Sequence, residues 1–113
     1  MLTVDQLREY GADVETGLSR CANNEGLYLR LVNICAQELS SQALETALKA
    51  GELDQAFEIA HKLKGGVTNL ALTPIAEPVC ELTELLRSKT PGDYDALYAE
   101  MMQKTNELMA LLK

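Results

Sequence analysis

Apolar residues recur at helical spacing along most of this 113-residue chain, and this periodicity limits the folds available to it. Gly, Pro and Ser interrupt the pattern at intervals, whereas no alternating apolar and polar run of useful length predicts a strand. The composition agrees, since 47% of the residues are hydrophobic, only 4% are aromatic and Trp is absent. We therefore expect an all-α fold in a single domain over residues 1–113, because a chain of this length supports one packed core.

The first half of the chain predicts two short helices and a longer helical stretch. Thr3 suits the N-cap of the first short helix, which should end near Gly11, and the second should cover Asp13 to Arg20. The Ser40-Ser41 pair either bends or breaks the longer stretch, and Gly51 suits the position just after its end. That stretch, from about Asn24, carries the apolar residues Leu27, Leu31, Ile34, Cys35, Leu39, Leu44 and Leu48.

The segment from about Glu52 to Leu70 predicts a helix with two contrasting faces. His61, the only histidine of the chain, points away from the centre of the apolar stripe and should face solvent. A lone histidine on an apolar face would usually be a packed core residue, but this one lies on the other face. The stripe itself consists of Ala56, Ile59, Ala60, Leu63, Val67 and Leu70.

Two further helices complete the pattern. Thr73-Pro74 provides an N-cap and a first helical residue for a segment that should stop near Ser88. The turn Thr90-Pro91-Gly92-Asp93 then leads to the last helix. Sizeable amphipathic helices with short connections predict an antiparallel up-down four-helix bundle with one or two short extra N-terminal helices. The expected inward residues are Ile75, Val79, Leu82 and Leu86 in the fourth segment and Tyr94, Leu97, Met101, Leu108 and Leu112 in the last.

The charge and cysteine content exclude several classes of function. With 17 acidic and 10 basic residues, the net charge is −7, which disfavours nucleic acid and membrane surfaces as partners. No apolar run approaches the roughly 20 residues of a membrane span, and the N-terminus lacks the basic and apolar regions of a signal peptide. A cytoplasmic protein is therefore expected. Three cysteines without a CxxC pair predict neither disulfides nor a metal site, and Cys35 and Cys80 are expected to be buried.

His61 and its neighbours on the solvent side form the strongest candidate site. A neutral imidazole is a good nucleophile near pH 7, and a phosphoryl group on its ring would add a charge close to −2. Lys64 lies one turn further along, where its ammonium group can reach that charge. Gly65 and Gly66 leave the surface beside the ring bare, at a cost of about 1 kcal/mol each relative to Ala. This pattern indicates access for another protein, although Gly66, which points nearer the core, also suits close helix packing.

The segment AHKLKGGVTNL, residues 60–70, resembles the motif of histidine-containing phosphotransfer (HPt) domains. That motif reads approximately Ala-His-x-Leu-Lys-Gly and closes with an Asn-Leu-Gly-like sequence. One departure is Ala71, because the family usually has Gly after that Leu, and it bears on the backbone geometry at the helix end. The similarity covers roughly residues 20 to 90, and in length the whole chain. The match runs through Ala60, His61, Leu63, Lys64, Gly65, Asn69 and Leu70.

The resemblance implies that His61 accepts a phosphoryl group from the aspartate of one receiver domain and passes it to another. HPt domains have no kinase activity, and the receiver supplies Mg²⁺ and most catalytic groups, so no cofactor is expected on this chain. Lys64 would stabilise the phosphoryl charge. The expected partners are receiver domains of a hybrid histidine kinase or of response regulators, and a monomer is expected. The expected docking residues are Phe57, Glu58, Lys62, Gly65, Thr68 and Asn69.

Two other functions stay open at this point. A degenerate bundle could act as an interaction scaffold without phosphotransfer. In an enzyme, His61 could act as a general base if Glu58 oriented its ring, but an exposed convex helix face offers no substrate pocket. Glu58 also suits a solvated helix position, and Lys62 suits either a surface charge or a group that steers a partner. Phe57 is either half-buried at the edge of the bundle or an apolar docking contact.

Overall fold

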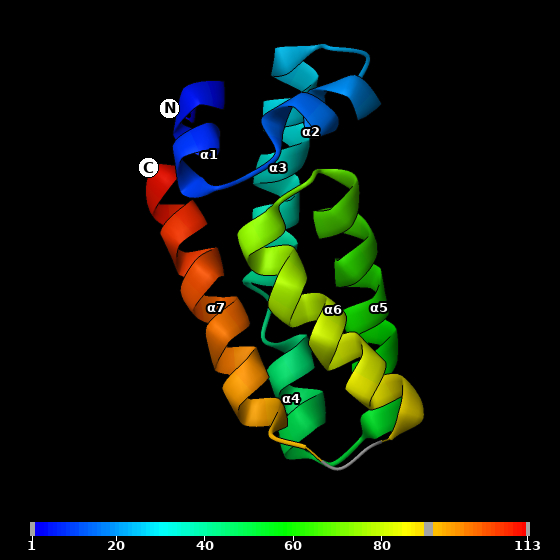
Figure 1. Ribbon diagram of the computed structural model, residues 1–113. Helices are drawn as coiled ribbons and strands as arrows, with labels where there is room; N and C mark the ends of the chain where they lie inside the picture. Colours follow the sequence, from blue (N-terminus) through cyan, green and yellow to red (C-terminus); the bar gives the residue numbers. More distant parts are fainter. Residues whose placement is uncertain (1, 90–91, 113) are drawn as a thin grey trace.

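The structure, a computed structural model, describes residues 2–89 and 92–112, and in these two ranges it contains helices and no strand (Figure 1). The all-α prediction is therefore confirmed. The helices are α1 (Val4–Tyr10), α2 (Val14–Arg20), α3 (Glu25–Leu39), α4 (Ala43–Lys49), α5 (Leu53–Asn69), α6 (Thr73–Ser88) and α7 (Tyr94–Leu111).

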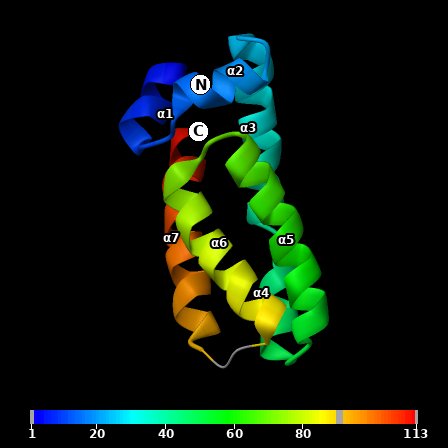
Figure 2. The same ribbon diagram turned by 45° about the vertical axis from the view of Figure 1, so that its right-hand side comes forward.

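Four rods form the bundle, and consecutive rods run antiparallel (Figures 1 and 2). Helices α3 and α4 lie end to end and make the first rod, which is followed by α5, α6 and α7. Helix α6 packs between α5 and α7, and α5 also contacts the α3–α4 rod. Helices α1 and α2 cover the end of the bundle where α5 turns into α6, and both chain ends lie there. The structure thus has the expected four-helix bundle with two extra N-terminal helices.

The caps of the short N-terminal helices follow the sequence signals. The Thr3 hydroxyl accepts a hydrogen bond from the Gln6 backbone N–H at 3.1 Å, and the Gln6 side chain accepts one from the Thr3 N–H at 2.9 Å. Helix α1 ends at Gly11, whose φ of +113° favours glycine. The Asp13 carboxylate accepts a bond from the Thr16 N–H and caps α2. Both boundaries were therefore predicted correctly.

In the first rod, the structure decides between the two alternatives that the sequence left open at Ser40-Ser41. The chain leaves the helix after Leu39, so the Ser40-Ser41 pair breaks the stretch and does not merely bend it. Leu27 and Ile34, two of the apolar residues of this stretch, are 37% and 48% exposed. The buried face of α3 consists of Tyr28, Val32, Cys35, Ala36 and Leu39.

Helix α5 begins after Gly51, whose φ of +73° ends the preceding helix as expected. The apolar stripe faces the core, with Ile59 half-buried and the other five residues buried. Each of the larger buried side chains contributes about 1.5–3 kcal/mol by leaving water. His61 is exposed, as predicted, because it lies opposite the stripe.

The start of α6 lies one residue earlier than the Thr73-Pro74 signal predicted. Leu72 is the N-cap, and its carbonyl accepts bonds from the N–H groups of Ile75 and Ala76 at 3.0 and 2.9 Å. Because the Leu72 side chain is fully buried, the core fixes this position and Thr73 becomes the first helical residue. The four expected inward residues of α6 are buried, and the helix ends at Ser88 as predicted.

The connection to α7 includes residues 90 and 91, so this part of the expected turn lies outside the described residues. The Asp93 carboxylate caps α7 by accepting a bond from the Ala96 N–H at 2.9 Å. Of the expected inward residues, two are buried and three are half-buried against the core. The buried ones are Met101 and Leu108, and the half-buried ones are Tyr94, Leu97 and Leu112.

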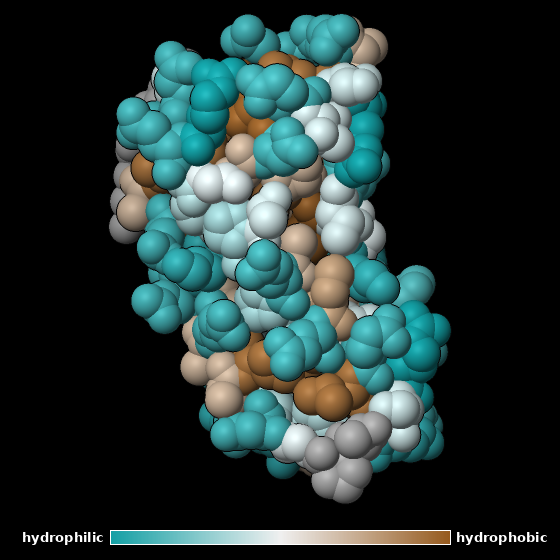
Figure 3. All heavy atoms as spheres, in the orientation of Figure 1, coloured by the Kyte–Doolittle hydropathy of each residue, from teal (hydrophilic) through white to brown (hydrophobic). Residues whose placement is uncertain are grey.

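All three cysteines are free thiols. Cys35 is buried as expected, and this burial raises the pKa of its thiol to about 11. Cys80 was expected to be buried but is only half-buried, whereas Cys21 is buried. Hydrophilic residues cover most of the face shown in Figure 3, with apolar patches between them, the largest in its lower half.

Candidate functional site

His61 lies in the middle of α5 and is exposed on the outer side of the helix, opposite the apolar stripe that faces the core. The Phe57 ring lies one turn earlier, with its centroid 5.6 Å from that of the His61 ring. Phe57 is half-buried, whereas Glu58 and Lys62 are exposed on either side of His61. The imidazole is therefore exposed on the surface, with the Phe57 ring beside it on the N-terminal side.

Lys64, one turn after His61, is held by a carboxylate from the neighbouring helix. Its Nζ lies 3.5 Å from Glu84 Oε1, and its side chain is 32% exposed. The other carboxylate oxygen of Glu84 lies 3.3 Å from Arg87 Nε. The Arg87 guanidinium lies over the Phe57 ring, 5.2 Å from its centroid. A chain of contacts thus runs from Phe57, beside His61, through Arg87 and Glu84. It ends at Lys64, one turn after His61.

Sequence reasoning missed Glu84 and Arg87. Both lie in the last turns of α6, where an acid and a base three residues apart suggest only a local pair. The short connection between α5 and α6 indicates an antiparallel hairpin, which places the end of α6 beside the first half of α5. That signal gives the neighbourhood, but the contact of Glu84 with Lys64 depends on how the two helices pack.

The two glycines after Lys64 have different surroundings. A Cβ atom added to Gly65 would meet no other atom within 4 Å, so this position faces open space. A Cβ atom on Gly66 would lie 3.4 Å from Cys35 Sγ, which is an ordinary packing distance. Gly65 therefore leaves the surface next to His61 bare, whereas Gly66 faces α3.

Thr68 and Asn69, expected to be docking residues, are exposed at the end of α5. The Thr68 hydroxyl donates to the Lys64 carbonyl at 2.7 Å, so it serves its own helix. The carbonyl oxygens of Thr68 and Asn69 accept hydrogen bonds from Arg20 Nη1 at 2.5 and 3.2 Å. A cation at a helix C-terminus is favourable because it faces the negative end of the helix dipole.

Ala71, where the motif usually has Gly, has a φ of +56°. This left-handed conformation costs an Ala residue roughly 1–2 kcal/mol, which explains the usual glycine. Its carbonyl accepts a bond from the Asp13 N–H at 2.9 Å, and the Leu72 N–H donates to the Val67 carbonyl at 2.9 Å. The departure from the motif therefore leaves the helix end intact, because neighbouring hydrogen bonds hold it.

The geometry gives little support to an enzyme that uses His61 as a general base. Within the described residues, no hydrogen bond joins Glu58 to His61, and no group of three or more His, Cys, Asp and Glu side chains could hold a metal ion. A cavity of about 290 Å³ beside α5 is lined by Ile59, Lys62 and Leu63 but not by His61.

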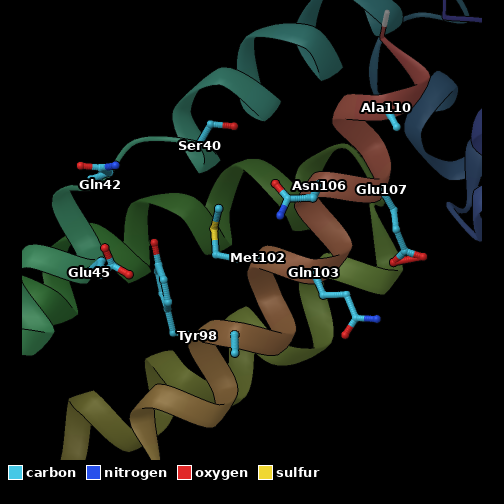
Figure 4. A pocket seen from close by; sticks show the side chains of 10 residues that line it. Ser40, Gln42, Glu45, Tyr98, Met102, Gln103, Asn106, Glu107 and Ala110 are labelled. Atoms are coloured by element: carbon cyan, nitrogen blue, oxygen red, sulfur yellow. The ribbon is translucent and has the colours of Figure 1, made fainter.

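A larger open groove of about 910 Å³ lies between the α3–α4 rod and α7 (Figure 4). None of its lining residues belongs to α5, and Figure 4 shows Tyr98 and Met102 of α7 facing Glu45 of α4. Burial and the nearby Glu45 carboxylate raise the pKa of Tyr98. This groove offers no nucleophile comparable to His61.

Chemically, the outer side of α5 offers an accessible nitrogen nucleophile, one adjacent cation and room for a second protein. No described helix is both long and apolar enough to cross a membrane. The family model described as "Hpt domain" matches residues 28–112. No curated protein and no solved structure matches the chain significantly.

Proposed function

Since the chain belongs to the Hpt domain family, we propose that His61 accepts a phosphoryl group from the aspartate of a receiver domain and passes it to another receiver domain. Hpt domains carry out histidine phosphotransfer in two-component systems and are not kinases. The observation that carries the proposal is the exposed His61 with Lys64 one turn along and bare backbone at Gly65.

The transfer proceeds as an in-line displacement at phosphorus. The lone pair of His61 Nε2 forms the new P–N bond while the P–O bond to the aspartate breaks. The bonding electrons leave with the aspartate carboxylate, and the Nδ1 proton of the imidazole passes to water. Nε2 is the favoured atom because it is the ring nitrogen farther from the backbone. The reverse sequence, with a second receiver aspartate as acceptor, completes the relay.

Lys64 stabilises the charge that the phosphoryl group brings to the helix surface. The group adds about two negative charges, and an ammonium one turn away offsets part of them. The Mg²⁺ ion and the remaining catalytic groups come from the receiver domain in this proposal. A monomer and a cytoplasmic location stay predictions from the sequence.

The proposed receiver-docking surface surrounds His61 on the outer side of α5. Phe57 gives an apolar contact, and its half-buried position under Arg87 also makes it part of the bundle edge. Gly65 gives room for the aspartate to approach. The remaining members are the exposed residues Glu58, Lys62, Thr68 and Asn69.

The test is to incubate the protein with phosphorylated receiver domains from its own genome and to follow the label. We expect one phosphorylated residue, His61, with an acid-labile and base-stable bond. His61→Ala should remove the label completely while leaving helix content unchanged, since His61 is exposed. Label that persists in His61→Ala, or that maps to Ser or Thr, contradicts the assignment. No transfer from any receiver would favour a scaffold without phosphotransfer.

A further inference from the structure

Glu84 occupies a position between two cations on the side of the bundle that carries His61. Its Oε1 faces Lys64 Nζ at 3.5 Å and its Oε2 faces Arg87 Nε at 3.3 Å. Arg87 is also fixed by the Phe57 ring beneath its guanidinium. One partner of Glu84, Arg87, is therefore held by both the carboxylate and the Phe57 ring. The other partner, Lys64, has a flexible side chain.

The pair of Glu84 with Lys64 is the longer of the two, at 3.5 Å compared with 3.3 Å for the pair with Arg87. The Glu84 side chain is 57% exposed and that of Lys64 is 32% exposed, so water screens their attraction. A phosphoryl group on His61 would place about two negative charges one helical turn from Lys64, against the single charge of Glu84. The lysine then has a stronger anion within reach on its own helix.

We propose that Glu84 is a positioning residue that holds Lys64 against α6 while His61 is unmodified, and that Lys64 exchanges Glu84 for the phosphoryl group after phosphorylation. This exchange rests on the proposed function of His61. Glu84 keeps Arg87 as its partner throughout, so the carboxylate is not left without a cation. No change in the helices is needed, because only the lysine side chain moves.

The exchange limits how strongly the phosphorylated state is stabilised. Lys64 must leave Glu84 before it can bind the phosphoryl group, and this competition shortens the life of the phosphohistidine. An intermediate that passes its phosphoryl group on benefits from such a limit, because a strongly held group would stay on His61.

The test uses phosphoramidate, which phosphorylates imidazole without a receiver domain and releases ammonia. Wild type, Glu84→Gln and the control Glu77→Gln are phosphorylated, the reagent is removed and the loss of label from His61 is timed. Glu77 lies two turns earlier on the same helix, is exposed and makes no ion pair with a described residue. We expect the phosphohistidine of Glu84→Gln to last about two- to fivefold longer, while Glu77→Gln stays at the wild-type value.

A double variant and one spectroscopic measurement distinguish exchange from a general effect of charge. In a Lys64→Ala background, Glu84→Gln should change the lifetime of the phosphohistidine little, because the lysine that Glu84 restrains is absent. The NMR signals of the Lys64 side chain should move on phosphorylation of wild type. Equal lifetimes for Glu84→Gln and wild type, an undiminished effect in Lys64→Ala, or Lys64 signals that stay fixed would each overturn the exchange.

These outcomes are separate from failure of the proposed function. If phosphoramidate labels His61 but no receiver does, the relay role fails while the lifetimes still decide whether Glu84 controls Lys64. If receivers label His61 and Glu84→Gln behaves as wild type, the relay role stands and the exchange is wrong.

Discussion

Gly17 and Gly65 both lie inside helices, where glycine costs about 1 kcal/mol relative to Ala, but their surroundings are opposite. A Cβ atom on Gly17 would lie 2.5 Å from Tyr28 Cε1 and 2.8 Å from the Leu70 carbonyl oxygen. A Cβ atom on Gly65 would meet nothing within 4 Å. Packing therefore requires glycine at position 17, whereas no contact among the described residues requires it at position 65.

The two positions represent two regions, which we call the cap junction and the open face. The cap junction is where α2 and the start of α3 meet the end of α5, through Gly17, Tyr28 and Leu70. The open face is the outer surface of α5 around His61, Lys64 and Gly65. A glycine without an internal reason suggests an external one, which agrees with a surface that another protein approaches.

Gly17→Ala should have the largest effect. Its methyl group overlaps the Tyr28 ring and the Leu70 carbonyl, so α2 must move away from the bundle. Overpacking and a weakened Tyr28 hydrogen bond together should lower the free energy of unfolding by about 2–4 kcal/mol. Chemical denaturation measures this change. Gly65→Ala is the matched control and should raise stability by about 0.5–1 kcal/mol. Equal effects at the two positions would remove the distinction between the regions.

Tyr28→Phe should have the next largest effect, because the Tyr28 hydroxyl donates to the Leu70 carbonyl at 2.9 Å. Loss of this buried bond should cost about 1–2 kcal/mol at neutral pH.

The same substitution should also change how stability depends on pH. Burial raises the pKa of Tyr28 to about 12, compared with about 10 in an unfolded chain. The unfolded state therefore loses this proton first, so the stability is complete below about pH 10 and declines as the pH rises to about 12. Tyr28→Phe should flatten that decline. Burial also raises the pKa of Tyr10, so Tyr10→Phe serves as the comparison. A decline of unchanged steepness in Tyr28→Phe would contradict this assignment.

The sequence predicts the open face better than the cap junction, and the reason is the distance between the partners. His61, Lys64 and Gly65 lie within five residues of one helix, so a single wheel places them relative to the stripe. Gly17 owes its role to Tyr28 and Leu70. A lone glycine in an expected short helix carries no signal of contacts with two later segments.

The distance in sequence between partners also explains which other features of the fold could be predicted and which could not. Local signals gave the ends of α1 and α2, because the cap of a helix lies within a few residues of it. The sequence left open whether the Ser40-Ser41 pair bends or breaks the first long stretch, and in the structure the chain leaves the helix after Leu39. Leu72, and not Thr73, is the N-cap of α6 because its side chain is buried in the core. Glu84 reaches Lys64 only after α6 packs on α5.

Gly65→Leu should have a smaller effect on stability and a large one on transfer. The helix gains up to about 1 kcal/mol because Leu is a better helix former than Gly. The new side chain, however, stands one turn from His61, where the receiver aspartate must approach. Transfer from a receiver should be lost, while phosphoramidate should still phosphorylate His61. If the variant loses several kcal/mol, Gly65 is required for packing. If transfer persists unchanged, the open surface is not needed for docking.

Lys64→Ala should change stability least. The lysine gives up one partly exposed ion pair with Glu84, and such pairs contribute at most about 1 kcal/mol. Alanine is also the better helix former, which offsets part of the loss. We expect the free energy of unfolding to change by less than about 0.5 kcal/mol.

Phosphotransfer should nevertheless slow, or the phosphohistidine should become shorter-lived, because the charge beside His61 is gone. Lys49→Ala is the matched control, since it removes an equal charge and an exposed ion pair, with Glu45, from α4 and outside the proposed docking surface. Denaturation curves and the rate of transfer from one receiver should be measured for both variants. A Lys64→Ala protein that transfers at the rate of Lys49→Ala would show that Lys64 acts only as a surface charge. A Lys64→Ala protein that unfolds would show that the open face also supports the bundle, and the contrast with the cap junction would then be wrong.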